Sequence, residues 1–280
     1  MSILILGGDM RQKYVNDYFR EKSYSSAYYA CFDLNEEFNN VLKSADVIVL
    51  PLPISKDGVH LNMEGKNVKM EDLFKRLASK SIVLAGSVSQ QIIDLAEQCG
   101  LRCIDYYKTE SFQIKNALLT AEGAIYYAQT RLERSIYGAN TAVLGFGRIG
   151  KILAYLLHAQ GAEVTIGARK ASDLHWSKLI GFNIISIGES EKAVFDNIGE
   201  FEVVFNTVPY WIISEQIAKK ISNKTQIIDL ASSPFGIDEK LVQKHRLDYR
   251  RELRIPGRYA PKSAGELIAQ TIIELMEEQL

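Results

Sequence analysis

Short apolar runs alternate with amphipathic stretches along the chain. In the first part, apolar runs of strand length fall at 3–6, 45–52, 81–85 and 101–106. Amphipathic stretches lie between them, for example a predicted helix at 90–98 that ends before Gly100. This alternation is typical of parallel sheets covered by helices, and it predicts an α/β fold.

The second part of the chain repeats the pattern. Apolar runs at 141–144, 163–166, 183–187, 202–206 and 226–230 predict strands, and 151–160 predicts a helix. Residues 112–136 lack proline and carry recurring apolar positions, which predicts one long helix between the parts. Residues 264–279 also have helical spacing, and because no further strand is predicted before them we expect this helix to pack back on the first domain.

These elements predict two domains, as the length of 280 residues also does at roughly 150 residues per domain. We expect a smaller, flavodoxin-like α/β domain for substrate or partner binding at 1–115. A linking helix at 116–137 should lead to a Rossmann dinucleotide-binding domain at 138–260. The C-terminal helix should occupy 261–280.

A GxGxxG motif stands between a predicted strand and a predicted helix. Its residues are Gly145, Phe146, Gly147, Arg148, Ile149 and Gly150. In a Rossmann unit the first glycine makes the tight turn, the second lets the backbone approach a diphosphate, and the third allows close packing of helix and strand. The motif therefore predicts a dinucleotide site, with a ligand-free glycine turn as the alternative.

The residues after the next strand indicate which dinucleotide is bound. An NAD enzyme usually places Asp or Glu there, about 20 residues beyond the glycines, to bind the adenosine ribose. This chain offers Arg169, Lys170 and Ser172 instead. The cations favour the 2′-phosphate of NADP, and the alternative is that they are ordinary solvated charges.

Two later strand ends should flank the nicotinamide, because ligands lie outside the carboxyl ends of strands in open α/β sheets. Thr207, Val208 and Pro209 follow one strand and Ala231 follows another. We expect them to contact the ribose and the nicotinamide ring. The alternative is plain turn chemistry around the prolines.

Composition excludes several classes of function. Lys and Arg (33) balance Asp and Glu (34), so no overall positive charge would attract nucleic acid. Three cysteines without a CxxC pair fit neither a disulfide framework nor a metal site. No apolar run reaches the roughly 18 residues of a membrane span, and the N-terminus is no signal peptide. We therefore expect a cytoplasmic protein that binds a small molecule, without metal, membrane or nucleic acid.

Positive charge is concentrated in one segment, 250–265. Its prolines and Gly257 predict a rigid loop over the second half. Arginine matches carboxylate geometry, so Arg258 and Lys262 could bind an anionic substrate. The alternative is a solvated charged face.

Seven motifs together resemble the family of dipicolinate synthase A subunits. They are GGDMRQ, ADVIVLPLP followed by Asp57-Gly58, TAEGAI, GFGRIG, FNTVP, DLASSPFGID and PGRYAPKSAG. The resemblance implies NADP-linked oxidation of dihydrodipicolinate to pyridine-2,6-dicarboxylate, on a branch of lysine biosynthesis used in sporulation. It also implies a partner, the B subunit of dipicolinate synthase, and a fold similar to 2-hydroxyacid and alanine dehydrogenases.

A dicarboxylate substrate needs cations, and Arg11, Arg258 and Lys262 could supply them. A base must also reach a ring proton, for which Asp57, His60 and Lys262 are unranked candidates. The Arg and the acid-paired His of 2-hydroxyacid dehydrogenases have no counterpart, because Ser stands where that Arg would follow the strand ending in DLASSPFG, and His245 has no evident partner. Reduction of a 2-keto acid is therefore disfavoured.

Other functions remain open at the level of sequence. The chain could be another NADP-dependent dehydrogenase, resembling shikimate or methylenetetrahydrofolate dehydrogenases, or a non-catalytic NADP-binding protein. The substrate could be dihydrodipicolinate or its hydroxylated tetrahydro precursor. A homodimer is possible, and the sequence does not decide whether turnover requires the B subunit.

Overall fold

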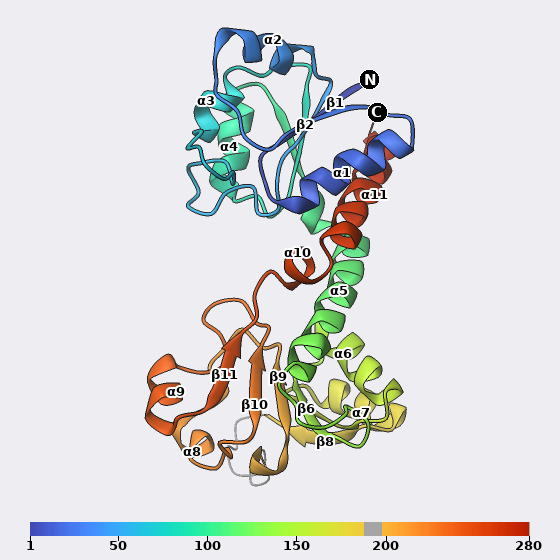
Figure 1. The fold of residues 1–280 in the computed structure, drawn as a ribbon, viewed down its shortest axis with the longest axis vertical. Helices are drawn as coiled ribbons and strands as arrows, with labels where there is room; N and C mark the ends of the chain where they lie inside the picture. Colours follow the sequence, from blue (N-terminus) through green and yellow to red (C-terminus); the bar gives the residue numbers. More distant parts are fainter. Residues whose placement is uncertain (188–197, 280) are drawn as a thin grey trace. The chain divides into compact units, whose positions relative to one another are not determined.

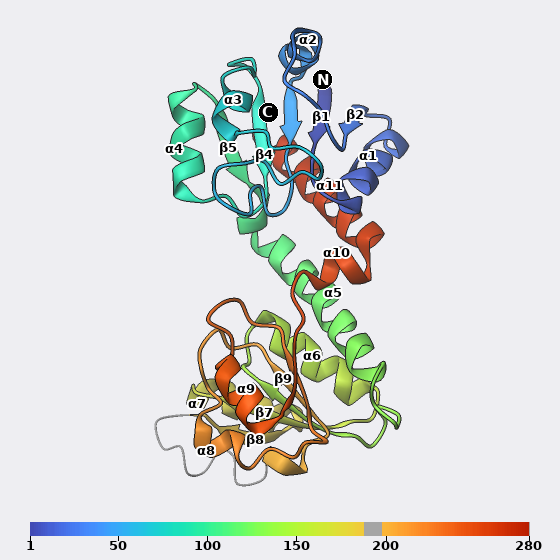
Figure 2. The same cartoon turned by 60° about the vertical axis from the view of Figure 1, so that its left-hand side comes forward.

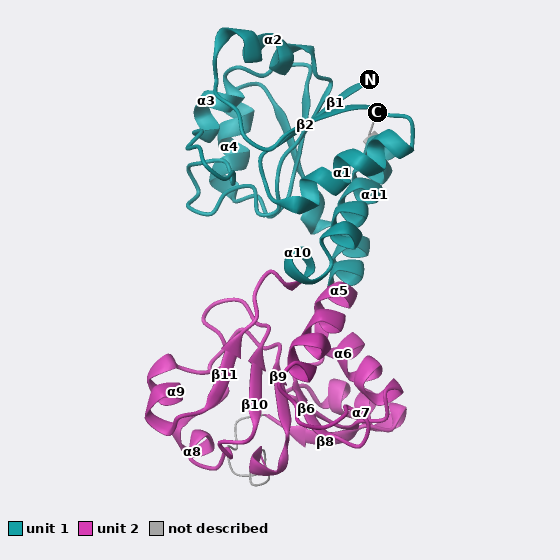
Figure 3. Cartoon of the chain, in the orientation of Figure 1, with its two compact units in different colours: residues 1–116, 256–280 teal, residues 117–255 magenta. Residues whose placement is uncertain are grey.

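The chain forms two α/β units in a computed structural model that describes residues 1–187 and 198–279 (Figure 1). Unit 1 combines Met1–Asn116 with Pro256–Leu280, and unit 2 is Ala117–Ile255 (Figure 3). No helix in the described part is long and apolar enough to cross a membrane. The predicted α/β class with two domains is confirmed.

Unit 1 contains a five-stranded parallel sheet. Its strands are β1 (Ser2–Leu6), β2 (Ser25–Tyr29), β3 (Val47–Val49), β4 (Ile82–Ala85) and β5 (Arg102–Asp105). They lie in the order β2-β1-β3-β4-β5, and every pair is parallel. This is the flavodoxin-like strand order, as predicted.

Helices cover both faces of the unit 1 sheet. They are α1 (Met10–Glu21), α2 (Glu36–Ser44), α3 (Met70–Phe74), α4 (Gln90–Gln98), the 3₁₀ helix η1 (Tyr106–Lys108) and α11 (Pro261–Gln279). Alternate strand residues such as Leu4 and Ile48 join the core formed with α2, α3 and α4. Helix α1 packs on β1 and β2.

Helix α11 lies beside α1, which confirms that the C-terminal helix returns to the first domain (Figures 1 and 2). Gly265 makes the close approach possible. A Cβ at this position would lie 2.5 Å from the carbonyl oxygen of Arg11 and 2.7 Å from Cβ of Tyr14. Any larger residue would therefore push the two helices apart.

Unit 2 contains a six-stranded parallel sheet. Its strands are β6 (Asn140–Leu144), β7 (Glu163–Ala168), β8 (Asn183–Ser186), β9 (Val203–Asn206), β10 (Gln226–Asp229) and β11 (Asp248–Arg251). They lie in the order β11-β10-β9-β6-β7-β8, with every pair parallel. In chain order this is the 3-2-1-4-5-6 arrangement of Rossmann folds.

Both faces of the unit 2 sheet are buried, as a parallel sheet requires. The elements around it are α5 (Glu110–Gln129, partly in unit 1), α6 (Arg148–Ala159), α7 (Ala171–Ile180), η2 (Ile198–Glu200), α8 (Glu215–Ala218), α9 (Glu239–His245) and α10 (Ile255–Tyr259, also shared with unit 1). Val143 faces the core formed with α5 and α6, whereas its neighbours Ala142 and Leu144 face the core formed with α8.

Several element predictions differ from the structure. The long helix ends at Gln129, not at 136, and the strand predicted at 45–52 is only Val47–Val49. Strands β2 and β11 were missed because they carry few purely apolar residues. The rigid loop predicted after Pro256 is wrong, because α10 and the start of α11 occupy it.

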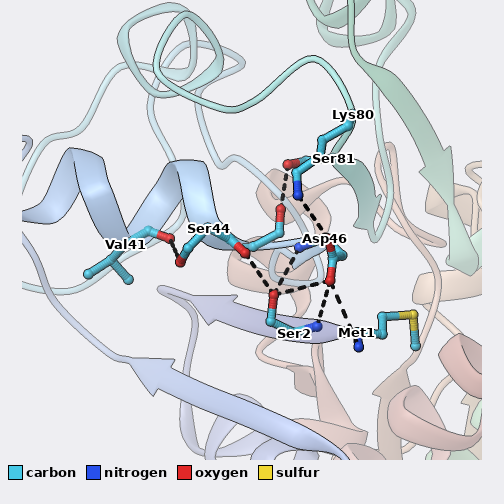
Figure 4. Close-up of polar contacts among 8 residues, drawn as sticks. Met1, Ser2, Val41, Ser44, Asp46, Lys80 and Ser81 are labelled. Atoms are coloured by element: carbon cyan, nitrogen blue, oxygen red, sulfur yellow. Dashed lines mark hydrogen bonds and ion pairs between the residues drawn. The ribbon is translucent and has the colours of Figure 1, made fainter.

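The amino ends of the unit 1 strands are joined through Asp46 (Figure 4). Its carboxylate accepts hydrogen bonds from the Ser2 backbone N–H at 2.8 Å and from Lys80 Nζ at 3.2 Å. The hydrogen bond from Ser2 contributes most to lowering the pKa of Asp46, and Lys80 adds to it. These contacts lie at the amino ends of the strands. Ligands of α/β proteins bind at the opposite edge, outside the carboxyl ends of the strands.

Candidate functional site

The glycine motif lies at the carboxyl edge of the unit 2 sheet, where β6 and β9 are neighbours and the strand order reverses. Gly145 has φ +99°, a conformation that favours glycine. Its backbone N–H donates to the carbonyl of Gly167, and a Cβ there would strike Oγ1 of Thr207. Gly145 therefore makes the tight turn predicted for it.

The other two glycines also match their predicted positions. Gly150 lies in the first turn of α6, and a Cβ there would overlap the carbonyl of Gly145, 2.9 Å from its carbon atom. Gly147 is the N-cap of α6, and a Cβ there would meet no described atom within 4 Å. The backbone at Gly147 is thus open to a ligand.

This arrangement fits a dinucleotide diphosphate. Helix α6 has 12 residues, and no described side chain caps its N-terminus. Backbone N–H groups and the helix dipole favour an anion at such an end. The side chain of Phe146 is buried in the core of the unit, so only its backbone could contribute. Arg148 and Ile149 form the first turn of the helix.

The cations predicted to select NADP directly follow β7. Arg169 and Lys170 are exposed, and Lys170 is the N-cap of α7. Among the described residues neither forms an ion pair with an acidic group. Ser172 is exposed in the first turn of α7. Guanidinium, ammonium and hydroxyl donors are therefore available at the strand end that faces an adenosine ribose in this fold.

The turn after β9 is tied to the glycine turn. Thr207 donates to the carbonyl of Leu144 twice, from its backbone N–H at 2.8 Å and from Oγ1 at 2.9 Å. The backbone N–H of Val208 donates to Oδ1 of Asn206 at 3.1 Å, and Asn206 Nδ2 donates to the carbonyl of Val208 at 3.0 Å. Pro209 follows and is exposed. The predicted contact residues thus lie on a turn that its own polar groups hold rigid.

A fully buried carboxylate, Asp229, stands at the end of β10. Its Oδ1 accepts from Asn206 Nδ2 at 2.8 Å and from the backbone N–H of Ala231 at 3.0 Å. Its Oδ2 accepts from the backbone N–H of Gly236 at 2.7 Å and from the hydroxyl of Tyr249 at 2.8 Å. The N–H of Ala231, a predicted cofactor residue, is therefore already used.

Unit 1 carries a second polar edge, after β1. Arg11 is buried, and its Nε and Nη2 donate to the two oxygens of Asp9 at 2.9 and 2.8 Å. Nη2 also donates to the carbonyl of Leu52. Burial of Asp9 would raise its pKa, but the hydrogen bonds and charge of Arg11 outweigh burial and lower the pKa.

Two donors remain on this turn of α1. Nη1 of Arg11 has no hydrogen-bond partner among the described residues, and the adjacent Gln12 has a buried Nε2 that also lacks one there. Helix α10 lies close, since a Cβ at Gly257 would be 2.9 Å from Nε of Arg11. The structure therefore brings Arg11 and the segment before Arg258 together.

Arg258 and Lys262 lie on helices, not on the predicted loop. Arg258 belongs to α10 and is exposed. Lys262 belongs to the first turn of α11, its side chain is 72% exposed, and its Nζ lies 3.7 Å from Oε1 of Glu266. Arg250 and Arg251 are strand residues of β11. The positive charge of the segment is thus distributed over three elements.

Asp57 and His60 form a pair within one loop of unit 1. Oδ2 of Asp57 lies 2.7 Å from Nδ1 of His60. Oδ1 accepts from the backbone N–H groups of His60 and Val59 and from Oγ of Ser55. These hydrogen bonds, that of the His60 backbone first, hold the pKa of Asp57 far below its usual range.

Metal and disulfide chemistry have no visible basis in the described residues. No group of three or more His, Cys, Asp and Glu side chains there could hold a metal ion. Cys31, Cys99 and Cys103 are free thiols. His245 lies in α9 with Nε2 3.9 Å from Oε1 of Glu215, so it does have an acidic neighbour.

Sequence reasoning missed Asn206, Asp229 and Tyr249. A signal was present, because β9 (VVFN) and β10 (QIID) are apolar strands that each end in one polar residue. A fully buried polar side chain needs hydrogen-bond partners. Here Asn206 and Asp229 bond to each other. The pairing of Asp9 with Arg11 was also missed, although both belong to GGDMRQ.

Comparison with known proteins agrees with the motifs. Residues 2–107 match the family model of the N-terminal domain of the dipicolinate synthase A subunit. The dipicolinate synthase A subunit of Bacillus subtilis (strain 168) is 27% identical over 291 residues, covering 99% of this chain and 96% of the relative.

Solved structures of other proteins have the same fold. The crystal structure of the dipicolinate synthase A subunit from Bacillus halodurans superposes with a TM-score of 0.85 at 23% identity, covering 98% of this chain and 97% of that one. A D-lactate dehydrogenase from a Sporolactobacillus species superposes with a TM-score of 0.67 at 15% identity, covering 99% and 95%. The expected similarity of fold to 2-hydroxyacid dehydrogenases is confirmed.

Proposed function

We propose that this chain, whose resemblance to dipicolinate synthase A subunits is confirmed along nearly its whole length, catalyses an NADP-dependent oxidation of dihydrodipicolinate to dipicolinate. The main support for this proposal is the glycine turn of unit 2. It is open to a ligand and precedes a 12-residue helix at the point where the strand order reverses. That geometry suits a dinucleotide diphosphate.

NADP is proposed over NAD because of the residues after β7. Arg169 and Lys170 can donate to a 2′-phosphate, and neither is an acceptor for ribose hydroxyls. Ser172 adds a hydroxyl donor. The diphosphate would lie against the backbone from Gly145 to Gly150, and the turns at Thr207–Pro209 and Ala231 would flank the nicotinamide.

The proposed substrate is a cyclic dicarboxylate. On α1, Nη1 of Arg11 is a donor without a described partner, and it could bind a carboxylate. Asp9 cancels much of the charge of Arg11 while fixing its orientation. Arg258 and Lys262 would supply further positive charge. The same residues could bind the hydroxylated tetrahydro precursor.

The proposed reaction removes one hydride and one proton from the dihydropyridine ring. When bound, NADP⁺ supplies a hydride acceptor. The chain must orient the ring and accept the proton, and loss of both gives the aromatic product with electrons balanced. Alignment of the ring should therefore carry much of the rate.

The geometry favours His60 among the three candidate bases. Asp57 is a weak base, because four hydrogen bonds stabilise its ionised form. As the acceptor of a hydrogen bond from Nδ1–H of His60, Asp57 favours the tautomer in which Nε2 is the acceptor nitrogen. Lys262 is the second candidate, and its Nζ lies 3.7 Å from Oε1 of Glu266, which gives the amine a role in charge pairing.

A second protein chain is part of the proposal. The relatives are named as one subunit of dipicolinate synthase, which describes an enzyme built from several chains. We propose that this chain works with the B subunit of dipicolinate synthase in the cytoplasm of a spore-forming cell. A homodimer of the chain is a further possibility of the same proposal.

Direct assay tests the function. Purified protein is mixed with NADP⁺ and freshly generated dihydrodipicolinate, with and without the B subunit, and NADPH and pyridine absorbance are followed. We expect equal amounts of NADPH and dipicolinate, above the spontaneous rate. His60→Gln should reduce kcat by about 100-fold, as expected for loss of a general base, and Lys262→Gln should mainly raise KM.

Two outcomes of this assay would contradict parts of the proposal. No turnover in either mixture, with NADPH still bound, would indicate a non-catalytic NADP-binding protein. Turnover by His60→Gln at the parental kcat would remove His60 as the base while leaving the reaction itself intact.

A further inference from the structure

We infer that Asp229 is a positioning residue that fixes both turns beside the nicotinamide half of the cofactor. The inference rests on the proposed function, since it assumes that a dinucleotide occupies the edge of unit 2. The carboxylate of Asp229 forms its hydrogen bonds with neither the glycine turn nor Arg169. Asp229 acts through Asn206, Ala231 and Gly236.

Asp229 accepts four hydrogen bonds and donates none. The donors are the Asn206 amide, two backbone N–H groups and the Tyr249 hydroxyl, at 2.7 to 3.0 Å. The carboxylate is fully buried, and no described cation forms an ion pair with it. Hydrogen bonds from neutral donors must therefore replace the hydration of its charge.

Each half of the carboxylate holds a different stretch of chain. Oδ1 orients Asn206, which clamps Val208 by donating to its carbonyl and accepting from its N–H. Oδ2 holds the N–H of Gly236 and so closes the turn that begins after β10. One carboxylate thus links the turns that follow β9 and β10.

The packing leaves little freedom for these turns. A Cβ at Gly236 would lie 2.7 Å from Cγ of Asn206, so the loop backbone presses against the amide. On the other side, Arg251 Nε donates to the Tyr249 hydroxyl at 3.3 Å, and the guanidinium stacks over Phe235 at 4.2 Å from the ring centroid. Tyr249 and Arg251 therefore join β11 to the same loop.

Tyr249 supplies a donor that stays protonated. Burial raises the pKa of its phenol, and Asp229 raises it further, while the hydrogen bond from Arg251 opposes the change. The hydroxyl therefore continues to donate to Asp229 throughout the neutral range. Asparagine in place of Asp229 would lose this arrangement. One carboxylate oxygen would become an NH₂ group, which would face hydrogen-bond donors and could not accept from them.

The residues proposed to bind the 2′-phosphate are separate from this network. The glycine turn does contact the turn after β9 through Thr207, whereas the cations after β7 lie on the far side of β6 in the sheet order. Loss of Asp229 should accordingly change recognition of the nicotinamide half and leave recognition of the 2′-phosphate half unchanged. This separation distinguishes positioning from general structural damage.

The test uses the full chain and two probes. NADPH binding is measured by its fluorescence, and 2′,5′-ADP, which contains only the phosphorylated adenosine half, is measured by calorimetry. Asp229→Asn should weaken NADPH at least about tenfold, as expected for loss of a charge-assisted hydrogen bond, while 2′,5′-ADP changes less than about twofold. Tyr249→Phe should weaken NADPH by a smaller factor. Arg169→Asp is the matched control and should weaken both probes, because NADPH and 2′,5′-ADP carry the same 2′-phosphate.

Three outcomes would overturn the inference. Asp229→Asn could bind both probes as the parent does, or lose both equally while remaining folded. If Asp229→Asn fails to fold, Tyr249→Phe decides, and unchanged NADPH affinity in that variant contradicts the inference. Failure of the parent to bind either probe would instead refute the proposed cofactor site, so the two failures remain distinguishable.

Discussion

The two sheets present the same topological position with different chemistry. In unit 2 the edge between β6 and β9 carries a glycine turn with open backbone at Gly147. In unit 1 the edge between β1 and β3 carries Gly7 and Gly8, whose N–H groups already donate to the carbonyls of Tyr29 and Asn62. Glycines at a strand end therefore do not suffice for a phosphate site.

The N-termini of the two following helices differ as well. In unit 1, Asp9 caps α1, and Oε1 of Gln12 accepts a hydrogen bond from the Asp9 backbone N–H. An acidic cap repels phosphate and fills the position an anion would take. Helix α6 begins at Gly147 without a described side-chain cap. The dinucleotide therefore fits the N-terminus of α6 in unit 2. In unit 1, side-chain donors such as Arg11 are what could bind an anion.

The largest expected effect comes from Gly150→Ala. Its methyl group would overlap the carbonyl of Gly145, so the turn or α6 must shift. We expect NADPH affinity to fall by at least about tenfold and the free energy of unfolding to fall by about 1–3 kcal/mol. Fluorescence titration and urea unfolding measure the two effects.

Gly265→Ala is the matched control in unit 1. Its methyl group would meet the Arg11 carbonyl in α1 at 2.5 Å, so a similar loss of about 1–3 kcal/mol is expected. NADPH affinity should remain at the parental value. Equal loss of affinity in both variants would contradict the assignment of the dinucleotide to unit 2 alone.

Arg11→Met should have the next largest effect, and only on unit 1. The change removes the guanidinium donors from Asp9 and from the Leu52 carbonyl, while a side chain of similar length keeps the packing. We expect a loss of about 1–3 kcal/mol in urea unfolding, since the hydrogen bonds of a buried guanidinium are removed. NADPH affinity should not change, whereas KM for the dicarboxylate should rise.

The smallest effect concerns acid stability. The pKa of Asp9 is lower in the folded chain than in the unfolded chain, where it is about 4. At a pH above about 4 the ionised carboxylate therefore stabilises the fold. This contribution is lost as the pH falls through the lowered pKa. Asp9→Asn should therefore flatten the fall in urea midpoint as the pH drops below about 4. A variant that keeps the parental slope would show that other carboxylates account for it.

Most of the fold could be predicted because both sheets bury apolar strands of ordinary length. Strand β8 and helix α4 were recognised from local pattern alone. Strand β11 (DYRR) was not, because its polar residues are explained only by its neighbours, such as the hydroxyl of Tyr249 on Asp229.

The candidate site could be predicted only in part. The glycine turn has a fixed local spacing, so sequence located it. The partners of Asp229 and Arg11 come from distant segments, and only the folded sheet edges bring them together. The predicted loop at Arg258 failed for a different reason: Pro256 lies in the first turn of the short helix α10 and Pro261 is the first residue of α11, positions where proline is tolerated.

Calorimetric titration of the parent protein with NADP⁺ and NAD⁺ tests the central claim most directly. Arg169 and Lys170 predict NADP⁺ binding at least about tenfold tighter, and Arg169→Asp should remove most of that preference. Equal affinity of the parent for both cofactors, or binding of neither, would contradict the account.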